Sequence, residues 1–83
     1  MNELKKILAS FSGAVTATHT MPGNETGFFF SFANASNYEI TLLINGKSTI
    51  VPGWGTFDSP EDSIRTITIT NPSSGKYYLT VYA

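Results

Sequence analysis

His19 is the only histidine in the chain, so it is the first residue to consider for acid–base chemistry. A catalytic histidine needs an orienting carboxylate and a nucleophile within hydrogen-bond reach. The chain has no cysteine, and none of its serines lies in a Gly-x-Ser-x-Gly turn. His19 alternates onto one face with Val15, Ala17 and Met21, which is typical of a half-buried or interface histidine. We therefore expect a protein that is not an enzyme.

Asp58, Glu61 and Asp62 form the densest group of carboxylates. A calcium site takes roughly six to eight oxygen ligands, commonly from acidic residues that alternate along one loop. The segment Asp58-Ser59-Pro60-Glu61-Asp62 lacks that alternation. The sequence therefore predicts a solvated acidic loop, with no metal and no cofactor.

Trp54 is the only tryptophan, and Gly53 and Gly55 flank it, with Phe57 close by. An exposed indole at this position would give an aromatic platform for a sugar ring or a partner surface. Alternatively, Trp54 folds over the open end of a small core that needs its apolar area. The shortness of the chain favours the buried role. A carbohydrate-binding domain that uses Trp54 and Phe57 is the alternative function.

Tyr78 and Tyr82 point outward from the last expected strand, and Thr66, Thr68 and Thr70 point outward from the one before it. We expect these side chains to form one flat face that carries almost no charge. Charged residues make up 13% of the chain, against about 25% in an average protein. Aromatic side chains and few charges are typical of interface cores. The face is therefore a candidate interface for self-association.

The first twelve residues show the spacing of an amphipathic helix. Leu4, Ile7, Leu8 and Phe11 stand at i, i+3, i+4 and i+7, and Gly13 follows as a terminator. The sequence therefore predicts a helix over residues 1–12. Its apolar stripe is a second candidate interface, which would pack on the domain itself or on a partner.

From residue 13 onward the apolar period changes from 3.6 to 2, which predicts a β domain over residues 13–83. The expected strands are 15–21, 27–33, 38–44, 47–51, 63–71 and 76–83, with a loop or a helical turn at 56–62. Asn45-Gly46 is a strong signal for a hairpin that pairs Ile40 with Val51. We expect a mainly β fold: a small antiparallel sandwich or barrel of about six strands in meander order.

Length and charge exclude several further classes of protein. The chain has 83 residues, a net charge of −1 and a pI near 5.6. A basic field that would hold nucleic acid or an anionic membrane is therefore absent. The N-terminal stretch contains Ser10, Ser12 and Gly13, which disfavours a secretory signal. We expect a chain made in the cytoplasm without a cleaved signal peptide.

The segment 38–83 resembles small virion proteins of tailed phages, such as head-decoration, head-fibre and tail-tip proteins. The resemblance rests on the Asn45-Gly46 hairpin, Ile50-Val51-Pro52-Gly53, the Ile/Thr strand 63–70 and Ser74-Gly75-Lys76-Tyr77-Tyr78. It implies a structural component of a virus particle that acts through protein–protein assembly. The implied partners are further copies of the chain or another virion protein, and the implied location is the virion.

Overall fold

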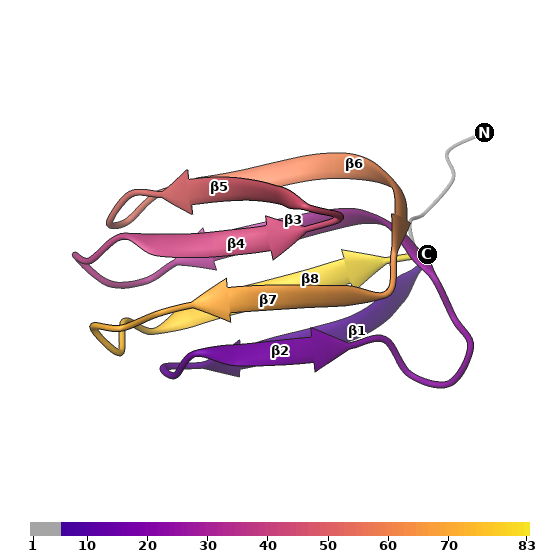
Figure 1. Cartoon of the computed structure of the whole chain (residues 1–83), viewed down its shortest axis with the longest axis horizontal. Helices are drawn as coiled ribbons and strands as arrows, with labels where there is room; N and C mark the ends of the chain where they lie inside the picture. The colour runs from indigo at the N-terminus through magenta and orange to yellow at the C-terminus, as the bar shows by residue number, and fades with distance from the viewer. Residues whose placement is uncertain (1–5) are drawn as a thin grey trace.

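Eight β-strands form the regular structure of residues 6–83, the part of the chain that the computed structural model describes. The strands are β1 (Ile7–Gly13), β2 (Ala17–Thr20), β3 (Gly27–Asn34), β4 (Ile40–Ile44), β5 (Lys47–Val51), β6 (Thr56–Ile64), β7 (Thr66–Thr70) and β8 (Tyr77–Tyr82). They form two four-stranded antiparallel sheets, sheet A in the order β1-β8-β3-β6 and sheet B in the order β2-β7-β4-β5 (Figure 1). The prediction of a mainly β antiparallel fold is confirmed.

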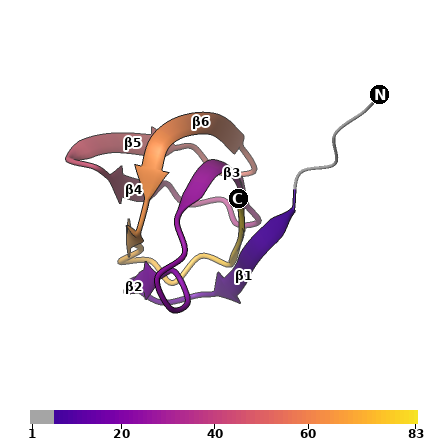
Figure 2. The same cartoon turned by 90° about the vertical axis from the view of Figure 1, so that its right-hand side faces the viewer.

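The chain crosses between the two sheets at nearly every connection. Within the described residues only β4 and β5 are consecutive strands that pair with each other. Viewed from the end, the strands of the two sheets enclose a shared interior (Figure 2). This strand order is that of a jelly roll, two interlocked Greek keys. The predicted meander order is therefore wrong, and residues 71–75 connect two sheets rather than closing a hairpin.

The β4–β5 hairpin follows the sequence prediction. Asn45 and Gly46 have φ angles of 52° and 78°, as a type I′ turn requires. Ile44 pairs with Lys47, and Ile40 pairs with Val51. The predicted register is therefore confirmed.

The core lies between the sheets and is built from alternate residues of the central strands. Phe30 and Phe32 of β3 are at most 1% exposed, and β3 lies between β8 and β6. The expected central position of this phenylalanine-rich strand is confirmed. The other buried hydrophobic residues are Met21, Ile40, Leu42, Ile44, Val51, Ile64, Ile67, Ile69, Tyr77, Leu79 and Val81.

Of the predicted N-terminal helix, the described residues from Ile7 onward form a strand and not a helix. Residues 7–13 form β1, which pairs with β8 along the edge of sheet A. The register shifts between Ile7 and Ala9, so Leu8 is an extra residue in a bulge. The bulge accounts for the helix-like spacing, because it lets apolar residues follow one another on a strand. An isolated helix of this length is marginal, whereas pairing with β8 gives the backbone inter-strand hydrogen bonds.

The segment predicted as an acidic loop is the edge strand β6. Phe57, Ser59 and Glu61 face inward with the period of a strand, between exposed neighbours. Pro60 is tolerated because β6 has only one pairing partner, β3, and proline is found on edge strands. The described residues contain no helix long and apolar enough to cross a membrane.

Candidate functional site

An apolar row crosses the outer face of sheet A from one edge to the other. Ile7 of β1 pairs with Tyr82 of β8, Tyr82 pairs with Phe29 of β3, and Phe29 pairs with Pro60 of β6. The rings of Phe29 and Tyr82 lie 5.8 Å apart. Ile7 is 58% exposed at one end of the row. We call Ile7, Tyr82, Phe29 and Pro60 the apolar row.

The rest of this outer face is polar but almost without charge. The paired strands place two further rows beside the apolar row, namely Ser10, Thr80, Ser31 and Asp58, then Ser12, Tyr78, Ala33 and Thr56. Asp58 is the only charged residue in these two rows. Tyr78 is 48% exposed and carries the Lys76 ammonium 5.5 Å from its ring centre. Two of the predicted interface residues, Tyr78 and Tyr82, therefore share one charge-poor face with Ile7.

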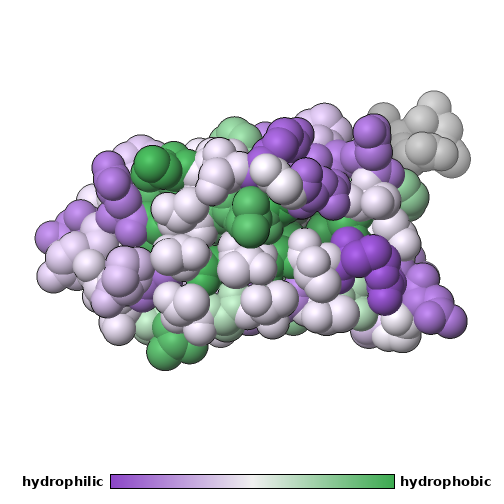
Figure 3. Space-filling view, in the orientation of Figure 1, coloured by the Kyte–Doolittle hydropathy of each residue, from purple (hydrophilic) through white to green (hydrophobic). Residues whose placement is uncertain are grey.

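Thr66 and Thr68 lie on the opposite side of the molecule. They project from β7 on the outer face of sheet B, whereas Tyr78 and Tyr82 project from β8 in sheet A. The expectation that these side chains share one face is therefore wrong. The outer face of sheet B is rich in threonine, with Thr18 and Thr68 hydrogen bonded at 3.1 Å, and it also exposes Leu43 and Ile50. Figure 3 shows near-white residues over much of this face, with strongly hydrophobic ones exposed among them and strongly hydrophilic residues toward the ends.

The residues of the predicted helical stripe do not share one surface, because a strand replaces the helix. Leu8 and Phe11 are partly buried and pack against the core, whereas Ile7 stays exposed. Leu4 lies outside the described residues. Of this stripe, Ile7 is therefore the described residue that remains available to a partner.

Trp54 lies at the tip of the β5–β6 connection and is 70% exposed. The prediction that it covers the core is wrong. The connection is a turn closed by a 2.9 Å hydrogen bond from the Gly55 N–H to the Pro52 carbonyl. Trp54 has a φ angle of 60° at a turn position that usually carries Gly or Asn. A bulky side chain in this conformation is strained, and such strain is concentrated at functional sites.

Phe57 does not join Trp54 in an aromatic platform. It lies on the inward face of β6, packs against the core, and its ring centre is 5.7 Å from that of Phe30. The two residues proposed for sugar stacking therefore have separate roles. Of these two residues, Trp54 has the exposure that a platform needs and Phe57 does not.

His19 closes one side of the sandwich together with two aromatic rings. Its ring stacks on Phe11 with a centroid distance of 4.3 Å, and its Nε2 lies 2.8 Å from the Tyr77 hydroxyl oxygen. Burial lowers the pKa of His19 below its ordinary value and raises that of Tyr77. These contacts place the imidazole at the margin of the core as a half-buried side chain, in agreement with the sequence prediction.

We expect acid to destabilise the fold through His19. Because its pKa is lower in the folded state, the unfolded chain takes up the proton first as the pH falls below about 6.5. The free energy of unfolding is therefore highest above that pH and falls toward the lower, folded-state pKa. Thermal unfolding of the wild type and of His19→Gln between about pH 8 and pH 5 checks this. The substitution removes the titrating group, whose ordinary pKa is near 6.5, so the variant should lose this part of the pH dependence. A wild-type profile identical to that of His19→Gln would contradict the prediction.

Among residues 6–83, no three histidine, aspartate or glutamate side chains gather closely enough to hold a metal ion. The fold and its surfaces define a jelly-roll β-sandwich in which an apolar row crosses the outer face of sheet A. Comparisons with known proteins give no matching family model, and no significantly similar curated protein or solved structure.

Proposed function

We propose that this protein is a non-enzymatic structural component of a virus particle, a capsid-decoration or other accessory protein that works by protein–protein assembly. It associates with further copies of itself through the outer face of sheet A. The observation that carries the proposal is the apolar row, which crosses all four strands of that sheet.

The chemistry of this face favours a second copy of the chain as its partner. Identical faces meet in a symmetric contact, so a strongly charged face would repel itself. Here the rows contain one carboxylate, and their aromatic residues are of the kinds enriched in interface cores. A small domain with a thin core also gains stability when its folded form associates.

Assignment to a virion rests on two further arguments. One is the resemblance of residues 38–83 to small virion proteins of tailed phages. The other is topological, because viral capsid proteins are a major group of jelly rolls. The same fold also serves lectins, so topology supports the assignment by analogy alone.

Carbohydrate binding through Trp54 is the second candidate function. Its support is the 70% exposure of the indole together with the strained backbone that holds it at the tip of a turn. Tyr38, which is 50% exposed, is a second aromatic residue in the neighbouring β3–β4 connection. A lectin would use such aromatic side chains to stack on sugar rings.

The solution mass, measured by light scattering over a range of concentrations, tests the assembly proposal. We expect discrete oligomers for the wild-type chain and a roughly tenfold or greater rise in the dissociation constant for Ile7→Lys, because the lysine buries a charge in the contact. Ile50→Lys is the matched control, since Ile50 is 60% exposed on the opposite outer face, against 58% for Ile7. It should leave the mass unchanged.

Trp54→Ala completes the comparison, with a glycan array as the second measurement. Under the assembly proposal this variant keeps the oligomeric mass. A wild-type monomer at every concentration would overturn self-assembly, as would equal effects of the two lysine substitutions. Glycan binding that disappears in Trp54→Ala would establish the second candidate instead.

A further inference from the structure

The two sides of the sandwich are closed in different ways. Between β1 and β2 the stacked rings of Phe11 and His19 fill the gap between the sheets. Between β5 and β6 a cleft of about 350 Å³ remains, which falls within the size range of small-molecule sites. Its apolar lining is Phe30, Leu42, Ile44 and Phe57, and its polar lining is Lys47, Ser48, Thr49, Ser59 and Glu61.

Glu61 of β6 faces this cleft, because it continues the inward alternation of Phe57 and Ser59, and a bulge follows it. Phe29 pairs with Pro60 and Gly27 pairs with Ile64, so three residues of β6 lie opposite a single residue of β3. The extra residues turn Ile64 inward as well, three positions after Glu61. Bulges commonly redirect a side chain beside a functional site. The side chain of Glu61 is only 9% exposed.

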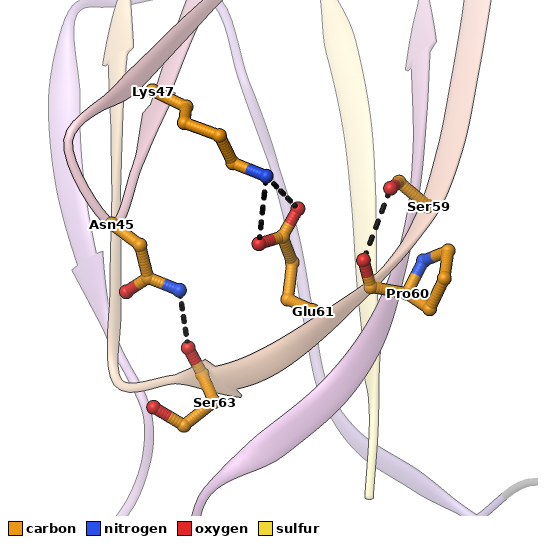
Figure 4. Close-up of polar contacts among 6 residues, drawn as sticks. All are labelled: Asn45, Lys47, Ser59, Pro60, Glu61 and Ser63. Atoms are coloured by element: carbon orange, nitrogen blue, oxygen red, sulfur yellow. Dashed lines mark hydrogen bonds and ion pairs between the residues drawn. The ribbon is translucent and has the colours of Figure 1, made fainter.

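Lys47 lies opposite Glu61 and is a loosely held partner. Figure 4 shows the two side chains pointing toward one another, with the lysine Nζ 3.4 Å from each carboxylate oxygen. A charge-assisted hydrogen bond is normally about 2.8 Å long. The Lys47 side chain is 70% exposed, so the ammonium remains largely in solvent while the carboxylate does not. Ion pairs with such an exposed partner contribute little to stability.

We propose that this cleft binds a small organic amine, with its ammonium on Glu61 and its apolar group inside the cleft. The ammonium replaces that of Lys47, which swings into solvent at little cost. The apolar group of the ligand then covers Phe30, Leu42, Ile44 and Phe57. The sign of the ligand's charge follows from the pair itself, because the buried member is the carboxylate and the mobile member is the cation. This site is separate from the outer face of sheet A and does not depend on the assembly proposal.

The probe is 2-phenylethylammonium, with the neutral 2-phenylethanol as its matched control, and binding is followed by NMR titration. We expect the amine to shift resonances of β5 and β6, and the alcohol to bind at least about tenfold more weakly. Glu61→Gln keeps the size of the side chain and should weaken amine binding by roughly tenfold or more. Lys47→Ala removes the competing cation and should preserve or tighten binding.

Asp58→Asn provides the control for general electrostatic attraction, because Asp58 projects outward from the same strand. It should leave amine binding unchanged. Equal binding of the amine and the alcohol would overturn the proposal, because it would show apolar binding without the carboxylate. Loss of binding in Lys47→Ala, or no binding to the wild-type chain, would overturn it as well. Circular dichroism of each variant establishes that the fold is intact.

Discussion

Replacing Asn34 with alanine is expected to lower the free energy of unfolding by roughly 3 kcal/mol, because it leaves several buried polar groups without a partner. Asn34 is 3% exposed at the end of β3. Its Nδ2 lies within hydrogen-bond distance of the carbonyl oxygens of Tyr38, Val51 and Pro52, at 2.6, 3.2 and 3.1 Å. Its Oδ1 accepts hydrogen bonds from the backbone N–H and the hydroxyl of Ser36.

One side chain therefore joins the β3–β4 connection to the end of β5. Domains of this size have a free energy of unfolding toward the low end of about 5–15 kcal/mol. A loss of 3 kcal/mol corresponds to a fall in melting temperature of roughly 15 °C. Thermal and urea unfolding of Asn34→Ala measure both quantities.

Two further variants separate the network from the general effect of losing an asparagine. Asn37→Ala removes an exposed asparagine from the same connection and should change stability by less than about 0.5 kcal/mol. Asn34→Asp keeps an acceptor for Ser36 but directs a carboxylate at three carbonyl oxygens, so it should destabilise at least as much as Asn34→Ala. Equal stabilities of Asn34→Ala and Asn37→Ala would contradict the assigned role.

The features that the sequence predicts well are those set by near neighbours along the chain. Asn45-Gly46 determines a turn type, and the turn type determines the register of β4 and β5. Likewise, Tyr77, Leu79 and Val81 alternate with outward residues, so their burial follows from the period of a strand. Neither inference needs to know which other strands are present.

The features that the sequence predicts poorly depend on contacts between distant segments. The bulge at Leu8 breaks the alternation of β1 and leaves a spacing that also fits a helix. Pro60 and the nearby carboxylates disfavour a strand by local propensity, yet an edge position accommodates them in β6. Strand order is non-local as well, because consecutive strands of a jelly roll mostly lie in opposite sheets.

Sequence reasoning names Ile7 and Tyr82 as interface residues but does not bring them together, and it misses Phe29, Pro60 and Glu61, for the same reason. The apolar row brings together residues 7, 29, 60 and 82 through three separate strand pairings. Glu61 faces the cleft because residues 56–64 form an edge strand and not the expected acidic loop. One local signal was available for Trp54, since Pro52-Gly53 predicts a turn and turn tips are usually exposed.

Replacing Gly53 with alanine is expected to cost roughly 3 kcal/mol through a backbone clash rather than through φ strain. A Cβ at this position would lie 2.8–2.9 Å from three backbone atoms of Asn37. These atoms belong to the β3–β4 connection. In the same connection, the Ser36 carbonyl oxygen accepts a 2.8 Å hydrogen bond from the Trp54 N–H. The two connections must therefore separate to admit one methyl group, and Trp54 must move with them.

Gly23→Ala is the control that distinguishes the two causes. Gly23 has a φ angle of 55° and open space around it, so alanine there meets strain without a clash and should cost about 1 kcal/mol. Urea unfolding should therefore rank Gly53→Ala well below Gly23→Ala in stability. The reverse order would mean that the close packing of the two connections contributes little. In that case the close approach of Gly53 to Asn37 would not hold Trp54 in its strained conformation, and the turn itself would have to do so.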